Sequence, residues 1–264
     1  MKYNTRSIIR DPEGRTVGGV RLDGSPSFPT PFSMTDVPKP VDGSADPPSL
    51  RPDTGRAGIV IAGDRSERFD DTDKALVRLE GDPLISHVVS RVAPAVDELV
   101  VNCRRDQRDA LAAAIDDIAD VDRARVTFAL DGTDGQRAVA GIRVGLRATE
   151  AEYAVLVPCD VPRIEPAFLA HLLERARHRT GAAIRLAGHV EVLPSAVHVR
   201  AAEAACTETL ADDGGVDALR RALDPIVIDE REVAAHVDSR TLEDVDTPAD
   251  LRRLRARLES SGDR

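Results

Sequence analysis

From Ala57 onward, short apolar runs alternate with longer amphipathic stretches. Four of the apolar runs have the length of a strand and are rich in Val and Ile: Gly58–Ala62, Glu98–Cys103, Arg125–Leu130 and Tyr153–Pro158. Helix-like patterns separate or follow them, at Pro83–Val96, Asp106–Ile115, Ala138–Ala148 and Pro166–Arg177. This alternation predicts βαβ units, in which parallel strands are covered on both faces and are therefore apolar throughout. The expected fold is a Rossmann-like three-layer α/β/α domain with a mainly parallel, doubly wound sheet.

The C-terminal part of the chain has a less regular pattern. Three strands are expected there, at Ala182–Leu186, Val190–Val199 and Ile226–Ile228, and three helices, at Ala201–Leu210, Asp217–Leu223 and Pro248–Glu259. Asp246 or Thr247 is expected to cap the last helix, since Pro248 suits a first helical turn and a side-chain oxygen can accept from its free N–H groups.

The N-terminal segment has a different composition from the rest. Nine of the 17 prolines precede Arg56, mixed with Gly, Ser and Asp. Such a segment buries too little apolar surface to order itself, so residues 1–56 are expected to be a disordered leader, with a weak hairpin around Arg15–Leu22. The folded domain is expected to span residues 57–260.

Composition excludes several classes of protein. No apolar run approaches the roughly 18 residues needed to cross a bilayer, and charged residues interrupt the first twenty positions, unlike a secretory signal. A formal net charge of −10 disfavours nonspecific binding to nucleic acid or to an anionic membrane. The expectation is a cytoplasmic protein that binds neither. Cys103, Cys159 and Cys206 are far apart in the sequence and are expected to be small buried residues rather than a disulfide framework or a zinc site.

The segment after the first strand, Gly63–Lys74, is the first candidate for chemistry. A turn of small residues at a strand end exposes backbone N–H groups, which together with Arg68 and Lys74 could surround a phosphate chain. The chain has three lysines beside 33 arginines, and Lys74 is the only lysine in the expected domain. Lysine scarcity is typical of proteins from concentrated salt or of a GC-rich genome, and a retained lysine suggests a compact point charge. The alternative is a solvated charged loop.

A second candidate is Asp160, which follows the fourth apolar strand. In a doubly wound sheet, ligands bind beyond the carboxyl ends of the strands, where Asp160 would lie near the first loop. A carboxylate at this position could hold a Mg²⁺ ion that bridges phosphate oxygens. The alternative is that Asp160 caps the following helix. Asp246 offers a second carboxylate.

In order and spacing, a set of short motifs resembles the molybdenum cofactor guanylyltransferases, a family of the nucleotidyltransferase superfamily. The motifs are Ile61-Ala62-Gly63, Arg68, Lys74, Leu79–Leu84, Val100–Asn102, Asp131, Ala140-Gly141, Pro158–Pro162 and Asp246–Leu251. Each motif alone is only moderately specific, whereas the ordered set covers nearly all of Ala57–Leu258. The leader is not covered.

The resemblance implies an enzyme that transfers GMP from GTP to molybdopterin cofactor and releases pyrophosphate. By position, Ile61, Ala62 and Gly63 would line the nucleotide, Lys74 and Arg68 would bind the triphosphate, and Asn102 and Asp131 would face the base or ribose. Asp160 would bind Mg²⁺, with Asp246 as a second ligand. Guanine is expected because related cytidylyltransferases have Ala-Ala-Gly in place of Ile61-Ala62-Gly63. The resemblance also leaves room for transient contact with molybdoenzyme maturation proteins.

Two positions depart from the family pattern, because Asp64 and Asp70 replace glycines beside the phosphates. An aspartate adds a Cβ and a negative charge where a triphosphate should approach, which should weaken binding. Two alternatives therefore stay open. The acceptor could be another phosphorylated molecule, such as phospholactate or cobinamide phosphate, or the chain could be a nucleotide-binding relative that has lost turnover.

Overall fold

The computed structural model describes residues 55–63, 67–69, 72–132 and 138–262, together with three short strands near the N-terminus. The chain divides into two units, Met1–Leu50 and Arg51–Arg264. In the first unit, β2 (Thr16–Val20) pairs antiparallel with β1 (Ile8–Arg10) and with β3 (Pro26–Ser27). β2 lies in the region for which the sequence suggests a hairpin. The expectation that the rest of the leader is disordered concerns residues outside the described ones and stays a prediction.

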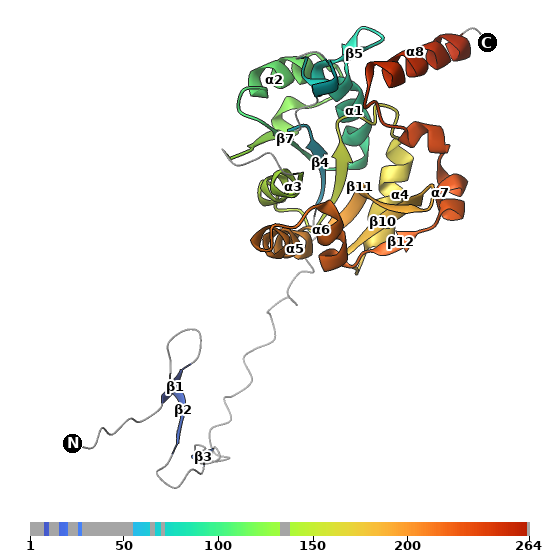
Figure 1. Ribbon diagram of the computed structural model, residues 1–264. Coiled ribbons are helices and arrows are strands. Elements are labelled where there is room, and N and C mark those ends of the chain that lie inside the picture. The colour runs from blue at the N-terminus through green and yellow to red at the C-terminus, as the bar shows by residue number, and fades with distance from the viewer. Residues whose placement is uncertain are drawn as a thin grey trace, which may run out of the picture. The chain divides into compact units, whose positions relative to one another are not determined.

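A seven-stranded sheet forms the centre of the second unit (Figure 1). Its strands, in spatial order, are β12 (Ile226–Ile228), β10 (Gly181–Leu186), β11 (His189–His198), β9 (Tyr153–Pro158), β4 (Arg56–Ile61), β7 (Glu98–Cys103) and β8 (Val126–Leu130). β11 runs antiparallel to β9 and β10, and the other neighbouring pairs are parallel. The predicted mainly parallel sheet is therefore confirmed, and it includes every strand expected from Ala57 onward.

Helices cover both faces of this sheet (Figure 1). One face carries α1 (Leu84–Val92), α2 (Arg108–Asp116), α4 (Pro166–Ala176) and α7 (Glu230–His236), and the other carries α3 (Ala138–Arg147), α5 (Val199–Ala211) and α6 (Val216–Leu223). The three-layer α/β/α architecture is confirmed. α7 was not expected from the sequence, because its seven residues are too few to show a clear helical period; Asp229 begins it by accepting from Glu232 N.

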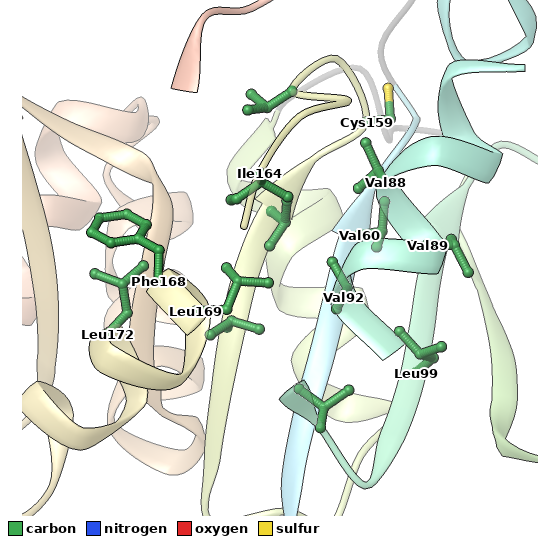
Figure 2. Close-up of a cluster of buried hydrophobic side chains, with 14 of the residues drawn as sticks. Val60, Val88, Val89, Val92, Leu99, Cys159, Ile164, Phe168, Leu169 and Leu172 are labelled. Carbon is green, nitrogen blue, oxygen red and sulfur yellow. The ribbon is translucent and has the colours of Figure 1, made fainter. Parts of the chain in front are cut away.

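The core on the first face lies between α1, α4 and the sheet (Figure 2). In α1, Ile85, Val88, Val89 and Val92 recur at helical spacing and are fully buried. Each such side chain contributes about 1.5–3 kcal/mol by leaving water. Cys103, Cys159 and Cys206 are buried and form no disulfide, as expected for small core residues.

The last helix, α8 (Pro248–Gly262), packs apart from the sheet. Its Leu251 and Leu254 join a small apolar cluster with Leu79 of β5 (Arg78–Leu79), which pairs with β6 (Asp82–Pro83). Of the two residues predicted to cap α8, Thr247 is the one that does so. Its Oγ1 accepts from Asp250 N, while the Asp250 carboxylate accepts from Thr247 N. This reciprocal capping fixes where α8 begins. Within the described residues, no helix combines the length and apolarity needed to cross a membrane.

Candidate active site

The residues predicted to bind the nucleotide follow neighbouring strands at one edge of the sheet. The parallel register pairs Ile61 with Asn102 on one side and with Pro158 on the other. Beyond the strands, Asp131 N donates to Cys103 O at 2.9 Å. The chain adds β7 and then β8 on one side of β4, and it adds the next strand, β9, on the other side of β4. The strand order therefore reverses at β4, although all four strands are parallel. A reversal of this kind is where doubly wound sheets bind ligands.

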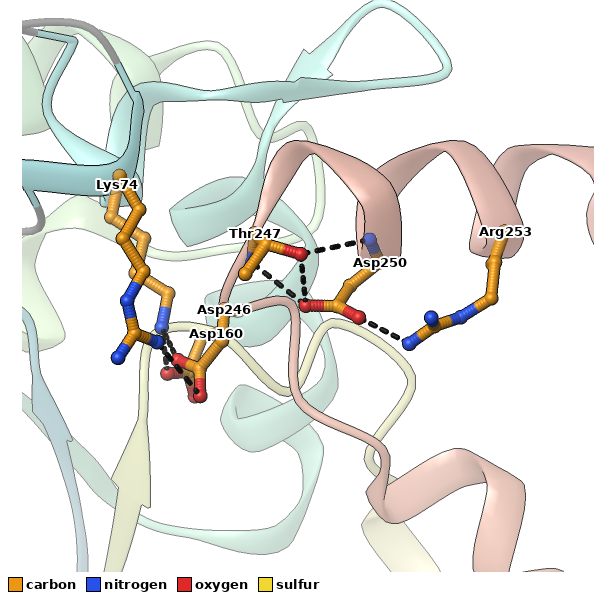
Figure 3. A network of polar contacts seen from close by, with 7 residues as sticks. Lys74, Asp160, Asp246, Thr247, Asp250 and Arg253 are labelled. Atoms are coloured by element: carbon orange, nitrogen blue, oxygen red, sulfur yellow. Dashed lines mark hydrogen bonds and ion pairs between the residues drawn. The ribbon is translucent and has the colours of Figure 1, made fainter.

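At this edge, Lys74, Asp160 and Asp246 form an ion cluster (Figure 3). Lys74 Nζ lies 2.5 Å from Asp160 Oδ2 and also donates to Asp246 Oδ1. The Lys74 side chain is 9% exposed, against 17% for Asp160 and 43% for Asp246. For Lys74 itself, the alternative of a solvated charged loop is therefore wrong, whereas Arg68 in the same segment is exposed. Asp160 is not a helix cap either, since α4 starts after Glu165.

Charge and burial oppose each other at Lys74. Burial by itself would lower the pKa of Lys74, but the nearby carboxylates of Asp160 and Asp246 outweigh it and raise that pKa. The amine is consequently an ammonium ion at any physiological pH. Burial also raises the pKa of the neighbouring Asp244 carboxyl, and the charges of Asp246 and Asp160 raise it further.

Three separate chain segments supply the ion cluster. Lys74 opens the short helix η2 (Lys74–Leu76), which Asp73 caps by accepting from Ala75 N. Asp160 follows β9, and Asp246 comes from the segment before α8. A backbone bond from Val245 N to Asp160 O, 2.9 Å long, places the last two segments side by side. The cluster thus depends on contacts between residues more than 80 positions apart.

A second group of residues, here called the amide pocket, comprises Asn102, Asp131, Gly63 and Gly141. Asn102 is 1% exposed, and its Nδ2 donates to Asp131 Oδ1 at 2.7 Å and to Ala129 O at 3.2 Å. Among the described residues, its buried Oδ1 has no hydrogen-bond partner. A Cβ on Gly141 would lie 2.5 Å from this oxygen, so only glycine leaves room for it.

The electrostatics of the amide pocket differ from those of the ion cluster. Burial raises the pKa of the Asp131 carboxyl, an effect that the Asn102 hydrogen bond and the Arg104 charge only partly oppose. A Cβ on Gly63 would overlap the Asp131 carboxylate, so Gly63 must stay small. Hydrogen bonds and close packing therefore dominate at this end of the site.

The remaining predicted residues differ in accessibility. Arg68 is 64% exposed on its side chain and lies 3.8 Å from Asp246, at the open side of the ion cluster. Ile61 and Ala62 are buried, and their side chains belong to the core. Ala62 N donates to Asn102 O, and Ile61 O accepts from Cys159 N, so these backbone groups are already paired within the fold. Asp64 and Asp70 lie outside the described residues.

Sequence reasoning missed three residues behind the ion cluster: Asp73, Arg104 and Gln107. Gln107 is 3% exposed and donates to Ala62 O at 3.0 Å and to Asp73 Oδ2. Arg104 donates to Gly63 O at 3.0 Å and to Asp73 Oδ2 at 2.8 Å. The signal that could have found them is that Gln107, directly before α2, lies one helical turn before the buried Leu111 and so continues the buried face of that helix.

The ion cluster also offers oxygens to a metal. Asp160 Oδ1 is buried and has no hydrogen-bond partner in the described part of the chain. Carboxylate oxygens suit hard cations such as Mg²⁺, which are commonly held by one or two carboxylates together with phosphates and water. No group of three His, Cys, Asp or Glu side chains with the arrangement of a metal site occurs among the described residues. Two carboxylates are thus the most that this edge would supply.

The chain matches the family model of the MobA-like NTP transferase domain over residues 58–227. It is 44% identical to a probable molybdenum cofactor guanylyltransferase of Haloferax mediterranei over 216 residues, which are 81% of this chain and 99% of that protein. A probable molybdenum cofactor guanylyltransferase of Natronomonas pharaonis is 39% identical over 204 residues, 77% of this chain and 98% of that protein.

The fold agrees with these sequence matches. The structure is similar to that of molybdopterin-guanine dinucleotide biosynthesis protein A from Archaeoglobus fulgidus, with a TM-score of 0.64 and 18% identity, over 77% of this chain and 99% of that one. The matched family model spans most of the sheet, and the curated relatives match over nearly their full length. The chain belongs to the MobA-like nucleotidyltransferases, within the molybdenum cofactor guanylyltransferase family.

Proposed function

We propose that this protein transfers GMP from GTP to the phosphate of molybdopterin cofactor, forming the guanine dinucleotide cofactor and pyrophosphate. The family supports the reaction, and one structural observation supports the site: Lys74 contacts Asp160 at the strand edge that also carries Asn102 and Asp131. In the reaction, an oxygen of the acceptor phosphate bonds to the α-phosphorus of GTP. The bond from that phosphorus to the α–β bridging oxygen breaks, and its electrons leave with pyrophosphate.

Positioning and charge neutralisation should dominate the catalysis, because both reacting phosphates are anionic. Lys74 is held as an ammonium ion with only 9% of its side chain exposed, where a charge acts more strongly than in water. We assign it to the triphosphate, where it would stabilise the departing pyrophosphate. Arg68, on the exposed side of the cluster, would bind the outer phosphates. No protein nucleophile is required.

We assign Mg²⁺ to Asp160 and Asp246. Asp160 Oδ1, which has no hydrogen-bond partner among the described residues, and the partly exposed carboxylate of Asp246 fit a cation that takes its other ligands from phosphate and water. When bound, the ion would neutralise phosphate charge and polarise the α-phosphate for attack. Asp160 and Asp246 would orient the ion, and the ammonium group of Lys74 would offset part of their negative charge.

We assign the base and ribose of GTP to the amide pocket. Asn102 and Asp131 hold each other in place, and Gly63 and Gly141 pack so closely against them that any Cβ would clash. The half-buried Asp131 carboxyl and the amide oxygen of Asn102 have the acceptor atoms that the N–H groups of guanine or ribose hydroxyls would need. CTP is the competing nucleotide in the test below.

The test is to incubate the purified protein with GTP, Mg²⁺ and molybdopterin cofactor and to search for the dinucleotide by mass spectrometry. We expect the guanine dinucleotide with GTP and at least tenfold less product with CTP. Formation of product only with phospholactate or cobinamide phosphate would replace the acceptor. Runs in molar KCl guard against unfolding of a salt-adapted protein in dilute buffer.

The alternative of a relative without turnover has its own test. If Asp64 and Asp70 have abolished activity, the double variant Asp64→Gly/Asp70→Gly should create it. We expect the wild-type protein to be active and the double variant to bind GTP more tightly. An inactive wild type together with an active variant would contradict the proposal.

A further inference from the structure

We propose that Gln107, together with Arg104 and Asp73, is a positioning residue for the nucleotide. These three side chains form a brace that ties two loop ends together, namely Ala62–Gly63 after β4 and Asp73–Lys74 at η2. This inference rests on the proposed GTP site. It adds residues that touch no reacting group and that set the relative positions of two segments that do.

The Gln107 side chain uses its whole amide in the brace. Its Nε2 donates to Ala62 O at 3.0 Å and to Asp73 Oδ2, and its Oε1 accepts from Arg104 N at 2.8 Å. Gln107 is only 3% exposed. Burying an amide is costly unless its hydrogen bonds are made, and an apolar residue would serve if the position needed packing alone. The buried amide therefore points to a specific geometric task.

Arg104 adds the second half of the brace. One guanidinium nitrogen donates to Gly63 O at 3.0 Å and another to Asp73 Oδ2 at 2.8 Å. The other oxygen of Asp73 accepts from Ala75 N at 3.1 Å, within η2. The Asp73 carboxylate thus binds Arg104, Gln107 and the start of η2 at once, and Asp73 directly precedes Lys74. Moving Asp73 would shift Lys74 from its 2.5 Å contact with Asp160.

The brace is anchored in a rigid part of the fold. Arg104 and Gln107 lie in the turn between β7 and α2, and β7 is an interior strand paired with β4 and β8. The two loop ends are therefore held against the sheet before any nucleotide arrives. Preorganisation of this kind raises affinity by lowering the ordering cost of binding. Its loss should weaken binding of GTP more than binding of the acceptor.

The decisive variant is Gln107→Glu, which keeps the shape but replaces the donating nitrogen with an oxygen that faces Ala62 O and the Asp73 carboxylate. We expect the Kd for GTP, measured by calorimetry with Mg²⁺, to rise at least tenfold. In the transfer assay, KM for GTP should rise similarly while KM for the acceptor stays within twofold. General destabilisation would not separate the two KM values. Gln107→Met, which removes the hydrogen bonds without adding charge, is the second variant in case the first does not fold.

Ser86→Ala is the matched control. Ser86 is 9% exposed and donates to Ala114 O at 2.9 Å, so the change removes a buried hydrogen bond between α1 and α2 without touching the loop ends. Its GTP affinity should stay within twofold of the wild type.

Each outcome has a definite meaning. Suppose that the wild type binds GTP well and that the folded Gln107→Glu and Gln107→Met variants bind it within twofold of the wild type. The proposed positioning role of the brace is then wrong, and the GTP site stands. If the wild type binds GTP without transferring it, the proposed reaction fails and the affinities still test the brace. If the wild type binds no GTP, the site and the brace fail together.

Discussion

Different interactions hold the two ends of the proposed nucleotide site together: ion pairs in the ion cluster, and hydrogen bonds with close packing in the amide pocket. The ion cluster gathers one ammonium and two carboxylates from three distant segments, and its Asp246 is 43% exposed. The amide pocket joins residues at neighbouring strand ends to Gly141 of α3. Its Asn102 is almost fully buried, and its two glycines pack where a Cβ would clash. The comparison teaches that the phosphate end should respond to changes of charge and the base end to changes of volume. Each prediction below tests one side of that contrast.

The largest effect is expected for Lys74→Met at the phosphate end. The change leaves Asp160 and Asp246 without their counter-charge, which should reduce the free energy of unfolding by ~3 kcal/mol, less than for a fully buried pair. It should also lower kcat/KM for GTP by at least about a hundredfold, as the loss of a transition-state donor does. Steady-state kinetics and urea unfolding measure both effects.

The double variant Lys74→Met/Asp246→Asn tests the stability effect, because Asp246 is itself assigned to Mg²⁺ and its loss would lower activity on its own. It removes one negative charge, so stability should largely recover while activity stays low. Recovery of activity with stability would show that Lys74 has only a structural role.

A tenfold effect is expected for Gly141→Ala at the base end. The new Cβ would lie 2.5 Å from Asn102 Oδ1, and KM for GTP should rise about tenfold, in line with the 1–3 kcal/mol typical of overpacking. Gly145→Ala is the matched control, since it lies one turn further along α3, where its Cβ would lie 2.5 Å from Ile59 Cγ2 in the core. That variant should change stability and leave KM for GTP unaltered. Equal KM values for the two variants would argue against a base site beside Gly141.

A smaller, pH-dependent effect is expected at Asp131. Because burial raises its pKa, the folded protein holds this proton to higher pH than the unfolded chain does. Stability should therefore fall as pH rises from the ordinary Asp range through the raised pKa. The difference between the wild type and Asp131→Asn in urea unfolding isolates this slope.

Asp250 should show the opposite slope. Hydrogen bonds from Thr247 lower the pKa of Asp250, so its contribution is present above the ordinary Asp pKa and is lost as pH falls through the lowered one. For each variant, the quantity to compare is the difference in free energy of unfolding from the wild type, plotted against pH. Slopes of the same sign for Asp131→Asn and Asp250→Asn would contradict the opposite pKa shifts of the two carboxyls.

The smallest effect is expected for Thr247→Ala. Loss of the cap at the start of α8 should cost about 1 kcal/mol of stability. Because Thr247 follows Asp246, we expect KM for GTP to rise about twofold, and Thr247→Ser should restore both values. A large loss of activity would mean that Asp246 depends on this cap more than on Val245 and Lys74.

Much of the fold follows from local pattern. The parallel strands are apolar throughout because helices cover both faces, so β4, β7, β8 and β9 and the residues that follow them could be predicted. Lys74 stood out because lysine is rare in this chain, and Asp160 because it ends an apolar strand.

The remaining features depend on contacts that sequence spacing does not reveal. The link from Val245 N to Asp160 O joins distant segments. Gln107 lies among charged residues between β7 and α2, so the sequence does not set it apart. Its role is visible only when Ala62 and Asp73 are seen beside it. The helix α7 is too short to show a period.

The most direct measurement is a crystal structure with a nonhydrolysable GTP analogue and Mn²⁺. The account predicts guanine against Asn102 and Asp131, the triphosphate beside Lys74, and an anomalous Mn²⁺ peak within coordination distance of Asp160. An analogue bound at another face of the domain, with Lys74 still closed on Asp160 and Asp246 and no metal beside them, would contradict it.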